Sequence, residues 1–192
     1  MTDYDATPAA SSGSAGGSFV VRDPHLKVID RPESDGMPFR KKIPLGKPQG
    51  PVEKILRTSK LRTVCEDAVC PNRHECYSKG TATFIVLGDV CTRRCPYCAI
   101  PQGRPQKPDE EEPERLGRAA KDMNLTHVVI TMVNRDELPD GGAEHVSACI
   151  DACRRHKPSI TVEVLTGDFL GKEAPIARVL EERPEVFNHN IE

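Results

Sequence analysis

The chain has 192 residues, of which 37% are hydrophobic, only 4% are aromatic and none is tryptophan. This length suffices for one domain with a real core, which must rest on aliphatic side chains. With 27 basic and 29 acidic residues the formal net charge is −2, so there is no overall positive field to hold nucleic acid. The longest apolar runs fall far short of the roughly 20 residues that a membrane-spanning helix requires. We therefore expect neither nucleic acid nor a membrane as a partner.

The first 80 residues divide into two segments of different composition. Residues 1–18 are rich in Ala, Ser and Gly, and we predict a disordered tail because so little apolar area cannot offset the ordering entropy. This start lacks the basic and apolar stretches of a secretory signal, so we expect a cytoplasmic protein. Residues 19–80 mix short apolar groups with prolines and charges, which predicts an irregular arm. Within it, a short helix beginning at Pro51 would lead into Cys65.

From residue 81 to residue 192 the pattern becomes regular. Strands are predicted over residues 83–87, 127–133, 160–165 and 186–191, and helices over residues 110–123, 144–155 and 172–182. This alternation predicts an α/β fold with about four parallel strands, in a sheet that is open or curled towards a barrel. The last predicted strand has no helix after it, and its outer edge would be exposed. We therefore expect the first part of a (β/α) barrel, in a chain that is truncated or is completed by a second chain.

Six of the eight cysteines fall between residues 65 and 98, in two triplets of different spacing: Cys65, Cys70 and Cys76, then Cys91, Cys95 and Cys98. The different spacing indicates two separate metal centres. Because a closed four-coordinate site normally needs four ligands, each centre would have an open position. In a reducing compartment, such cysteines indicate metal or redox chemistry rather than disulfides.

The second triplet directly follows the predicted strand 83–87. Catalytic groups of parallel barrels collect at this carboxyl end of the strands. Three thiolates on a tight loop suit an iron–sulfur cluster that leaves one iron unligated by protein. The alternative is a structural zinc loop with a fourth ligand from elsewhere. The spacing, the preceding strand and the aromatic Tyr97 before the last cysteine favour the cluster.

The stretch Cys91-Thr-Arg-Arg-Cys95-Pro-Tyr-Cys98 resembles the cluster loop of the radical S-adenosylmethionine (radical SAM) superfamily. The resemblance implies a partial barrel of the radical SAM type and a [4Fe–4S] cluster on these three cysteines. The open iron would be chelated by SAM, which an electron from the cluster would cleave to a 5′-deoxyadenosyl radical. SAM contacts are expected at five residues, for which packing or barrel lining is the alternative: Tyr97, Thr131, Asn134, Glu163 and Asn188.

The first triplet belongs to a more discriminating motif, Cys65-Glu-Asp-Ala-Val-Cys70-Pro-Asn-Arg-His-Glu-Cys76, which resembles the auxiliary-cluster signature of the lipoyl synthase family. Besides the cluster loop, five further stretches resemble that family in the same order: Gly80-Thr-Ala-Thr-Phe84, Gly103-Arg-Pro105, Arg135-Asp-Glu-Leu138, Asp140-Gly-Gly-Ala143 and Phe187-Asn-His-Asn-Ile-Glu192. The resemblance implies a second [4Fe–4S] cluster on the first triplet, which is dismantled to supply sulfur. The family completes this cluster with a serine near the C-terminus, to which no serine of this chain corresponds.

The resemblance to lipoyl synthases also implies a reaction. Two sulfur atoms would be inserted at carbons 6 and 8 of an octanoyl group on a carrier lysine, which gives lipoyl-lysine. The implied carriers are the lipoyl domains of 2-oxoacid dehydrogenase E2 subunits and the glycine cleavage H protein, and the implied electron donor is a ferredoxin or flavodoxin. Two alternatives stay open: another radical SAM sulfur-inserting or methylating enzyme, and an inactive fragment that binds an iron–sulfur cluster or zinc.

Other candidate residues have simpler explanations. Cys149 and Cys153 are four residues apart on a predicted helix and share one face, so we expect buried structural thiols. His74 is expected to be a solvated loop residue. Arg93 and Arg94 are expected to offset the negative charge of a cluster.

Overall fold

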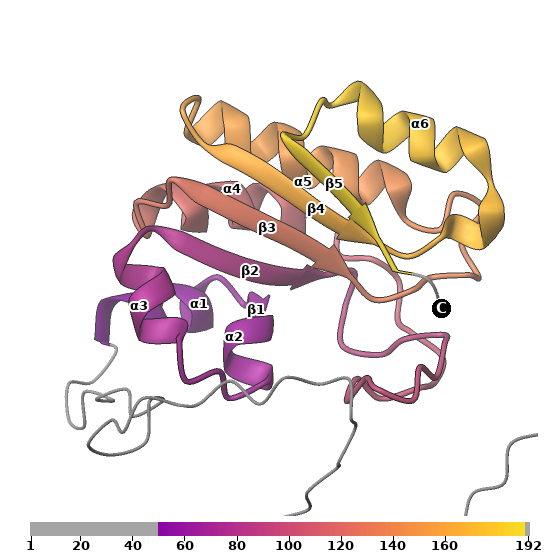
Figure 1. Ribbon diagram of the computed structural model, residues 1–192, viewed down its shortest axis with the longest axis horizontal. Coiled ribbons are helices and arrows are strands. Elements are labelled where there is room, and N and C mark those ends of the chain that lie inside the picture. Colours follow the sequence, from indigo (N-terminus) through magenta and orange to yellow (C-terminus); the bar gives the residue numbers. More distant parts are fainter. Residues whose placement is uncertain (1–49, 191–192) are drawn as a thin grey trace, which may run out of the picture. The chain divides into compact units, whose positions relative to one another are not determined.

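A five-stranded sheet organises residues 50–190, the part of the chain that the computed structural model describes (Figure 1). The strands lie side by side in chain order: β1 (Arg62–Thr63), β2 (Thr81–Val86), β3 (His127–Met132), β4 (Thr161–Thr166) and β5 (Val186–His189). β1 runs antiparallel to β2, and the other four strands are parallel. The predicted tail, residues 1–18, and the first part of the predicted arm lie outside the described residues.

The four parallel strands confirm the predicted fold class, and each predicted boundary within the described residues lies no more than two residues from the observed one. The sheet is not closed, since β1 and β5 form its two edges. The two-residue strand β1 was not predicted, because so short a segment carries no periodic signal. The structure is therefore an open sheet, in agreement with the partial barrel expected from the sequence.

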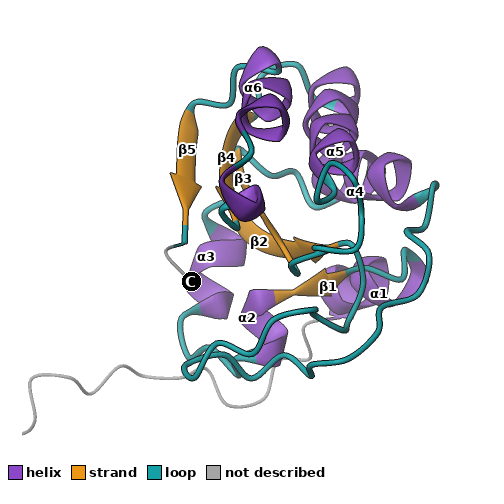
Figure 2. Cartoon of the chain, turned by 90° about the vertical axis from the view of Figure 1, so that its right-hand side faces the viewer, coloured by secondary structure: helices purple, strands orange, loops and turns teal. Residues whose placement is uncertain are grey.

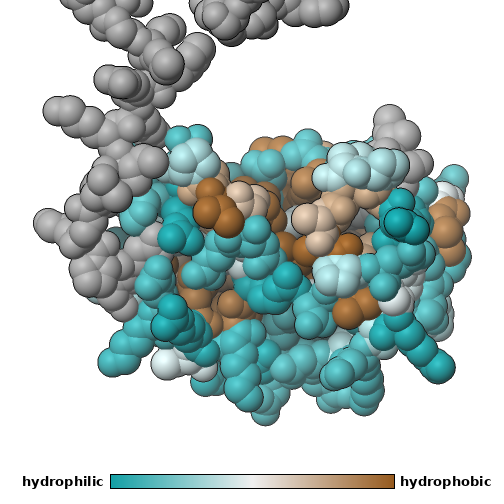
Figure 3. Space-filling view, turned by 90° about the horizontal axis from the view of Figure 1, so that it is seen from below, coloured by the Kyte–Doolittle hydropathy of each residue, from teal (hydrophilic) through white to brown (hydrophobic). Residues whose placement is uncertain are grey.

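Three helices cover one face of this sheet: α4 (Glu112–Asp122), α5 (Ala143–His156) and α6 (Glu173–Glu181) (Figures 1 and 2). The alternation of β3 explains the arrangement. Val128 and Ile130 are buried under the helices, whereas His127, Val129 and Thr131 point to the other face and are half-buried. Figure 3 views the molecule from below and shows apolar side chains among the polar ones on that side. Within residues 50–190, α4, α5 and α6 all lie on the other side of the sheet, so we call this second face the uncovered face.

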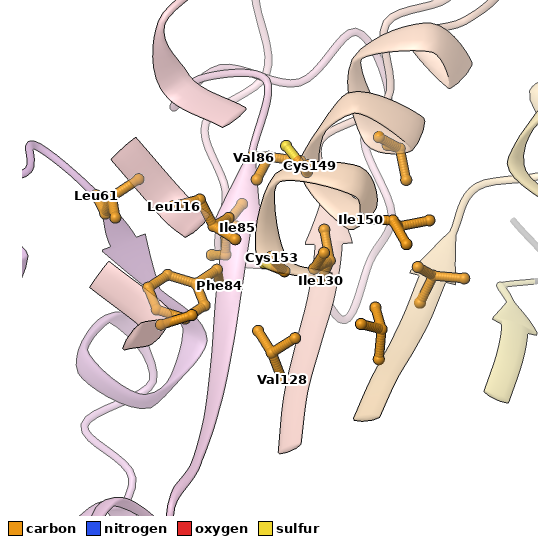
Figure 4. Close-up of a cluster of buried hydrophobic side chains, with 14 of the residues drawn as sticks. Leu61, Phe84, Ile85, Val86, Leu116, Val128, Ile130, Cys149, Ile150 and Cys153 are labelled. Atoms are coloured by element: carbon orange, nitrogen blue, oxygen red, sulfur yellow. The ribbon is translucent and has the colours of Figure 1, made fainter. Parts of the chain in front are cut away.

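The hydrophobic core lies between the sheet and the covering helices, and it is aliphatic as the composition predicts (Figure 4). Leu116 of α4 and Ile150 of α5 are fully buried there, together with Phe84 of β2. Cys149 and Cys153 belong to the same core, which confirms the prediction of buried structural thiols. Burial raises the pKa of Cys153 to about 12 and raises the pKa of Cys149 well above its ordinary value.

The described part of the arm contains three short helices. The helix predicted from Pro51 is confirmed as α1 (Gly50–Thr58), and it buries Leu56 against the core. Two unpredicted helices follow, α2 (Val64–Asp67) and α3 (Arg73–Ser78). The expectation for His74 was wrong, since this residue is half-buried in α3. None of the helices within residues 50–190 has the length and apolar character needed to cross a membrane.

Gly117 lies where α4 and α5 approach each other closely. A Cβ atom at this position would lie 2.6 Å from the carbonyl oxygen of Ala152 and 2.8 Å from Cδ2 of His156. Alanine would improve the helix propensity of α4 by up to about 1 kcal/mol, but it would push the helices apart. We predict that Gly117→Ala lowers the free energy of unfolding by about 1–3 kcal/mol in urea denaturation.

The control for this substitution is Lys121→Ala, at an exposed position of the same helix. This variant should change the free energy of unfolding by no more than about 0.5 kcal/mol. A Gly117→Ala protein as stable as the parent chain would contradict the close contact between the two helices.

Candidate functional site

The second cysteine triplet lies on a loop that closes on itself after the end of β2. The backbone N–H of Cys91 donates to the carbonyl oxygen of Pro101 at 2.9 Å, and the N–H of Gly103 donates to the carbonyl oxygen of Cys91 at 3.0 Å. Within the loop, the N–H of Cys98 donates to the carbonyl oxygen of Cys95 at 3.0 Å. We call residues 91–103 the cysteine loop. It places three thiols on one short segment at the carboxyl ends of the parallel strands.

The three thiols of the cysteine loop differ in exposure. Cys91 is buried, Cys95 is half-buried and Cys98 is exposed. The Sγ atom of Cys91 accepts hydrogen bonds from the backbone N–H groups of Arg93 at 3.4 Å and Asn134 at 3.3 Å. Backbone donors of this kind orient and tune the sulfur ligands of iron–sulfur clusters. The Sγ atom of Cys98 accepts one such bond from the N–H of Ile100 at 3.5 Å. Cys91 is thus the most buried thiol of the triplet, and two backbone donors hold its sulfur.

The first triplet is carried by α2, α3 and the turn between them, and its three thiols are half-buried. Thr63 joins the two helices. Its Oγ1 atom accepts a hydrogen bond from the N–H of Glu66 at 3.2 Å, which caps α2, and lies 3.1 Å from the hydroxyl of Tyr77 in α3. Burial raises the pKa of Tyr77, and the neighbouring Cys65 raises it further.

Within residues 50–190, no three His, Cys, Asp or Glu side chains are gathered closely enough to hold a metal ion. Neither cysteine triplet is therefore assembled as a ligand set. The donor chemistry does fit iron–sulfur clusters, because each triplet supplies three soft thiols from one short segment. The assignment of the six cysteines to two clusters stays a prediction.

Arg93 ties the cysteine loop to the loops that follow β3 and β4. Its Nε and Nη2 atoms bind the two carboxylate oxygens of Asp136 at 2.7 and 2.8 Å, and Nη2 also lies 2.7 Å from Oδ1 of Asp168. These carboxylates raise the pKa of Arg93, and Arg93 lowers the pKa of both Asp136 and Asp168. The charge of Arg93 is thus paired with two carboxylates of the protein, and the expectation that it offsets a cluster stays a prediction. The same holds for the exposed Arg94.

A second set of contacts joins the same three strand ends. The N–H of Thr92 donates to the carbonyl oxygen of Asn134 at 3.1 Å, and the Thr92 hydroxyl lies 3.0 Å from the same oxygen. Asn134 is buried, and its side chain fills the space beside Gly167, where any Cβ atom would clash with it. Asn134 therefore supports the cysteine loop from the end of β3, whereas its expected contact with SAM stays a prediction.

A chain of polar side chains crosses the uncovered face of the sheet. The Oε2 atom of Glu163 lies 3.3 Å from Nε2 of His127, and its Oε1 atom accepts a hydrogen bond from Nδ2 of Asn188 at 3.0 Å. The other ring nitrogen of His127 lies 2.7 Å from Oγ1 of Thr161. The structure thus brings together Glu163 and Asn188, two of the residues expected to bind SAM.

The other three expected SAM contacts lie apart from this pair. Thr131 is on the same face and donates from its hydroxyl to the carbonyl oxygen of Leu165 at 3.0 Å. Asn134 is buried beyond the end of β3, and Tyr97 is 71% exposed on the cysteine loop. The five residues therefore divide between the uncovered face and the carboxyl edge of the sheet, and their common role stays a prediction.

Several residues of this region were not predicted from the sequence. His127 could have been found from the two-residue period that it shares with Thr131, since both face away from the covering helices. Asp136 lies in a stretch that supported the family resemblance, but no role followed from that likeness. Asp168 carries no sequence signal, because only the tertiary fold brings it to Arg93.

Comparison with known proteins shows which family the chain is similar to. A family model for the radical SAM superfamily matches residues 85–192. The chain is 50% identical over 169 residues to the lipoyl synthase of Methylobacillus flagellatus, a match that covers 87% of this chain and 52% of that protein. It is 50% identical over 142 residues to the lipoyl synthase of Pseudoalteromonas translucida, which covers 73% of this chain and 44% of that protein.

A third similar protein is the lipoyl synthase of Acidithiobacillus ferrooxidans, which is 44% identical over 193 residues. That match covers 98% of this chain and 60% of the relative. The chain therefore spans about half the length of the curated relatives it matches.

Asp136 should be the stronger of the two partners of Arg93, because it makes two hydrogen bonds to the guanidinium and Asp168 makes one. We predict that Asp136→Asn lowers the free energy of unfolding by about 1–3 kcal/mol, and Asp168→Asn by less than about 1 kcal/mol. Urea denaturation at neutral pH measures both. Asp151→Asn, which breaks an exposed ion pair with Arg155, is the control.

The effect of Asp136→Asn should also depend on pH. Because Arg93 lowers the pKa of Asp136, the stabilisation is present above the unfolded pKa of aspartate, roughly 3.9. It is lost as the pH falls through the lower pKa of the folded protein. The difference between the parent chain and Asp136→Asn should therefore shrink in acid. Equal losses for Asp136→Asn and Asp168→Asn at neutral pH would contradict the proposed ranking.

Proposed function

Because the chain belongs to the radical SAM superfamily, we propose that it acts in lipoyl synthesis, inserting sulfur at carbons 6 and 8 of an octanoyl-lysine. The observation that carries this proposal is the 44–50% identity to proteins named lipoyl synthase, which extends over most of the chain. The first cysteine triplet supports it, because a second set of thiols suits a reaction that needs a source of sulfur.

In this proposal Cys91, Cys95 and Cys98 hold one [4Fe–4S] cluster, and Cys65, Cys70 and Cys76 hold the other. When bound, the cluster of the cysteine loop supplies the electron for the reductive cleavage of SAM, and the cluster of the first triplet supplies sulfur. An unactivated C–H bond requires the very reactive radical that such cleavage gives.

The protein's own residues would bind and orient the reactants. Arg93, with Asp136 and Asp168, holds the cysteine loop against the carboxyl ends of β3 and β4. The uncovered face offers the polar groups of Thr131, Glu163 and Asn188 between half-buried apolar side chains. Such a mixture of polar and apolar groups suits a small-molecule site.

We assign SAM to these uncovered-face groups and to two residues at the carboxyl edge of the sheet. Tyr97, exposed on the cysteine loop, would lie near the adenine, and Asn134 would complete the site. His127 would orient Glu163 through the hydrogen bond at 3.3 Å.

The partners follow from the proposed reaction. The octanoyl groups would be carried by lipoyl domains of 2-oxoacid dehydrogenase E2 subunits or by the glycine cleavage H protein. A ferredoxin or flavodoxin would supply electrons, and the reaction would take place in the cytoplasm. Because the chain spans about half the length of its curated relatives, a cluster-binding module without turnover is the second candidate.

We predict that anaerobic reconstitution with iron and sulfide loads iron–sulfur clusters onto the chain, up to about eight iron atoms for two [4Fe–4S] clusters. Cys91→Ala and Cys65→Ala should each lower the iron content by roughly half, because each removes one ligand set. Iron analysis and visible absorption measure the outcome. Cys149→Ala, which alters a core thiol, is the control and should keep the iron content of the parent chain.

The products distinguish the candidate functions. With SAM, a strong reductant and an octanoylated carrier peptide, lipoyl synthesis predicts both 5′-deoxyadenosine and the 6,8-dithiolane by mass spectrometry. 5′-Deoxyadenosine without the dithiolane would favour another radical SAM enzyme. Iron–sulfur absorption without either product would favour the cluster-binding module. Stoichiometric zinc without iron–sulfur absorption would contradict a radical SAM function for this chain.

A further inference from the structure

Arg135 lies at the base of the cysteine loop and is only 2% exposed. Its Nη1 atom donates to the carbonyl oxygen of Leu87 at 2.8 Å, and its Nη2 atom donates to the carbonyl oxygen of Gln106 at 2.6 Å. Leu87 directly follows β2, before the cysteine loop begins, and Gln106 lies shortly after the loop ends. One planar side chain therefore bridges the two ends of the segment that carries Cys91, Cys95 and Cys98.

The backbone at Leu87 is held from both sides. Its φ angle is 72°, in the left-handed region that a leucine seldom adopts. Its N–H donates to Oε2 of Glu112 at 2.9 Å, and the same oxygen lies 2.7 Å from Nε2 of His145. Such a conformation persists where the surroundings determine it, and here side chains from α4 and from the loop after β3 fix both polar atoms of Leu87.

The chemistry of Arg135 suits this position better than that of any other cation. Its Nε atom binds Oε1 of Glu137 at 2.6 Å, so the buried charge is paired while the two terminal nitrogens reach two carbonyl groups. The guanidinium presents its donors in a rigid fork. A lysine ammonium is a single point donor and could not span the carbonyl oxygens of Leu87 and Gln106 in this way.

We propose that Arg135 is a positioning residue that clamps the two ends of the cysteine loop and so limits how far its three thiols can separate when a metal cluster binds. The clamp is a property of the polypeptide, and the inference rests on the proposed function only for the identity of the bound cluster. Loss of the fork loosens the cysteine loop although every cysteine is still present. Glu112, which His145 contacts, binds the backbone N–H of Leu87 from α4 and so holds the same end of the loop.

The first test uses the metal-free chain. Cys91 is 7% exposed, so its alkylation by iodoacetamide reports opening of the loop. Arg135→Lys should raise the rate of Cys91 alkylation about tenfold, because a lysine cannot bridge the two carbonyl groups and at least one charge-assisted hydrogen bond at the base of the loop is lost. Cys149 and Cys153 should stay protected in the same sample, which mass spectrometry of the peptides resolves.

Two controls separate the clamp from general destabilisation. Arg118→Lys changes an exposed arginine that pairs with Glu114, and it should leave Cys91 protected. Val146→Ala opens a cavity in the core and should expose Cys149 and Cys153 at least as much as Cys91. Glu112→Gln keeps the shape of its side chain and weakens the hold on Leu87. It should therefore speed alkylation of Cys91 in the same direction, and it takes the place of Arg135→Lys if that variant does not fold.

The second test adds the cluster. In a chain whose Cys65, Cys70 and Cys76 are replaced by alanine, only the cysteine loop can hold iron and sulfide. Arg135→Lys in this background should lose its cluster to an iron chelator about tenfold faster than the same background with Arg135.

Protection of Cys91 that does not change in Arg135→Lys would overturn the clamp, and so would unchanged retention of the cluster. If the background with Arg135 takes up no cluster, the proposed function fails, while the alkylation rates still decide whether the clamp exists.

Discussion

The register of the parallel strands is the constraint on which the site depends. Val86 of β2 pairs with Met132 of β3, and Thr131 of β3 pairs with Leu165 of β4, so the three strands end at nearly the same level. Each of these strands is then followed by a loop at the same edge of the sheet. This is why Arg93, Asp136 and Asp168, which come from three separate loops, meet in one ion-paired group. A slip of one residue in any pairing would turn the side chains of that strand to the wrong face and disrupt these contacts.

The two faces of the sheet serve different ends. The face under α4, α5 and α6 carries the aliphatic core, where Gly117 allows two helices to approach closely and two cysteines act as small apolar groups. Parallel sheets are normally covered on both faces. Here the second face bears a hydrogen-bonded row from His127 through Glu163 to Asn188, and its residues are half-buried or exposed. Within residues 50–190, the packed face of the sheet thus supports a second face whose polar groups suit a ligand.

Sequence reasoning predicted what periodicity and local spacing determine. The alternation around Val128 predicts which side of a strand faces the core, and the four-residue spacing of Cys149 and Cys153 places both on one side of a helix. All three residues are buried in the structure. The sequence could not predict which loops meet at the carboxyl edge of the sheet. Arg135 binds Leu87 and Gln106 across long stretches of chain, and no local pattern marks that contact. The spacing of the cysteines likewise predicts that each triplet binds one metal cluster. Among the described residues, however, no three His, Cys, Asp or Glu side chains lie close enough together to hold a metal ion.

The two cysteine triplets differ in the way the protein supports them. The cysteine loop is closed by backbone bonds at Cys91, held at its base by Arg135 and tied by Arg93 to the ends of two further strands. The first triplet lies on the short helices α2 and α3, which Thr63 joins and which pack against β2. A cluster that delivers electrons in every reaction cycle benefits from a rigid base, whereas a cluster that gives up sulfur must be taken apart. Within residues 50–190, the support of the cysteine loop therefore agrees with the electron-transfer role proposed for its cluster.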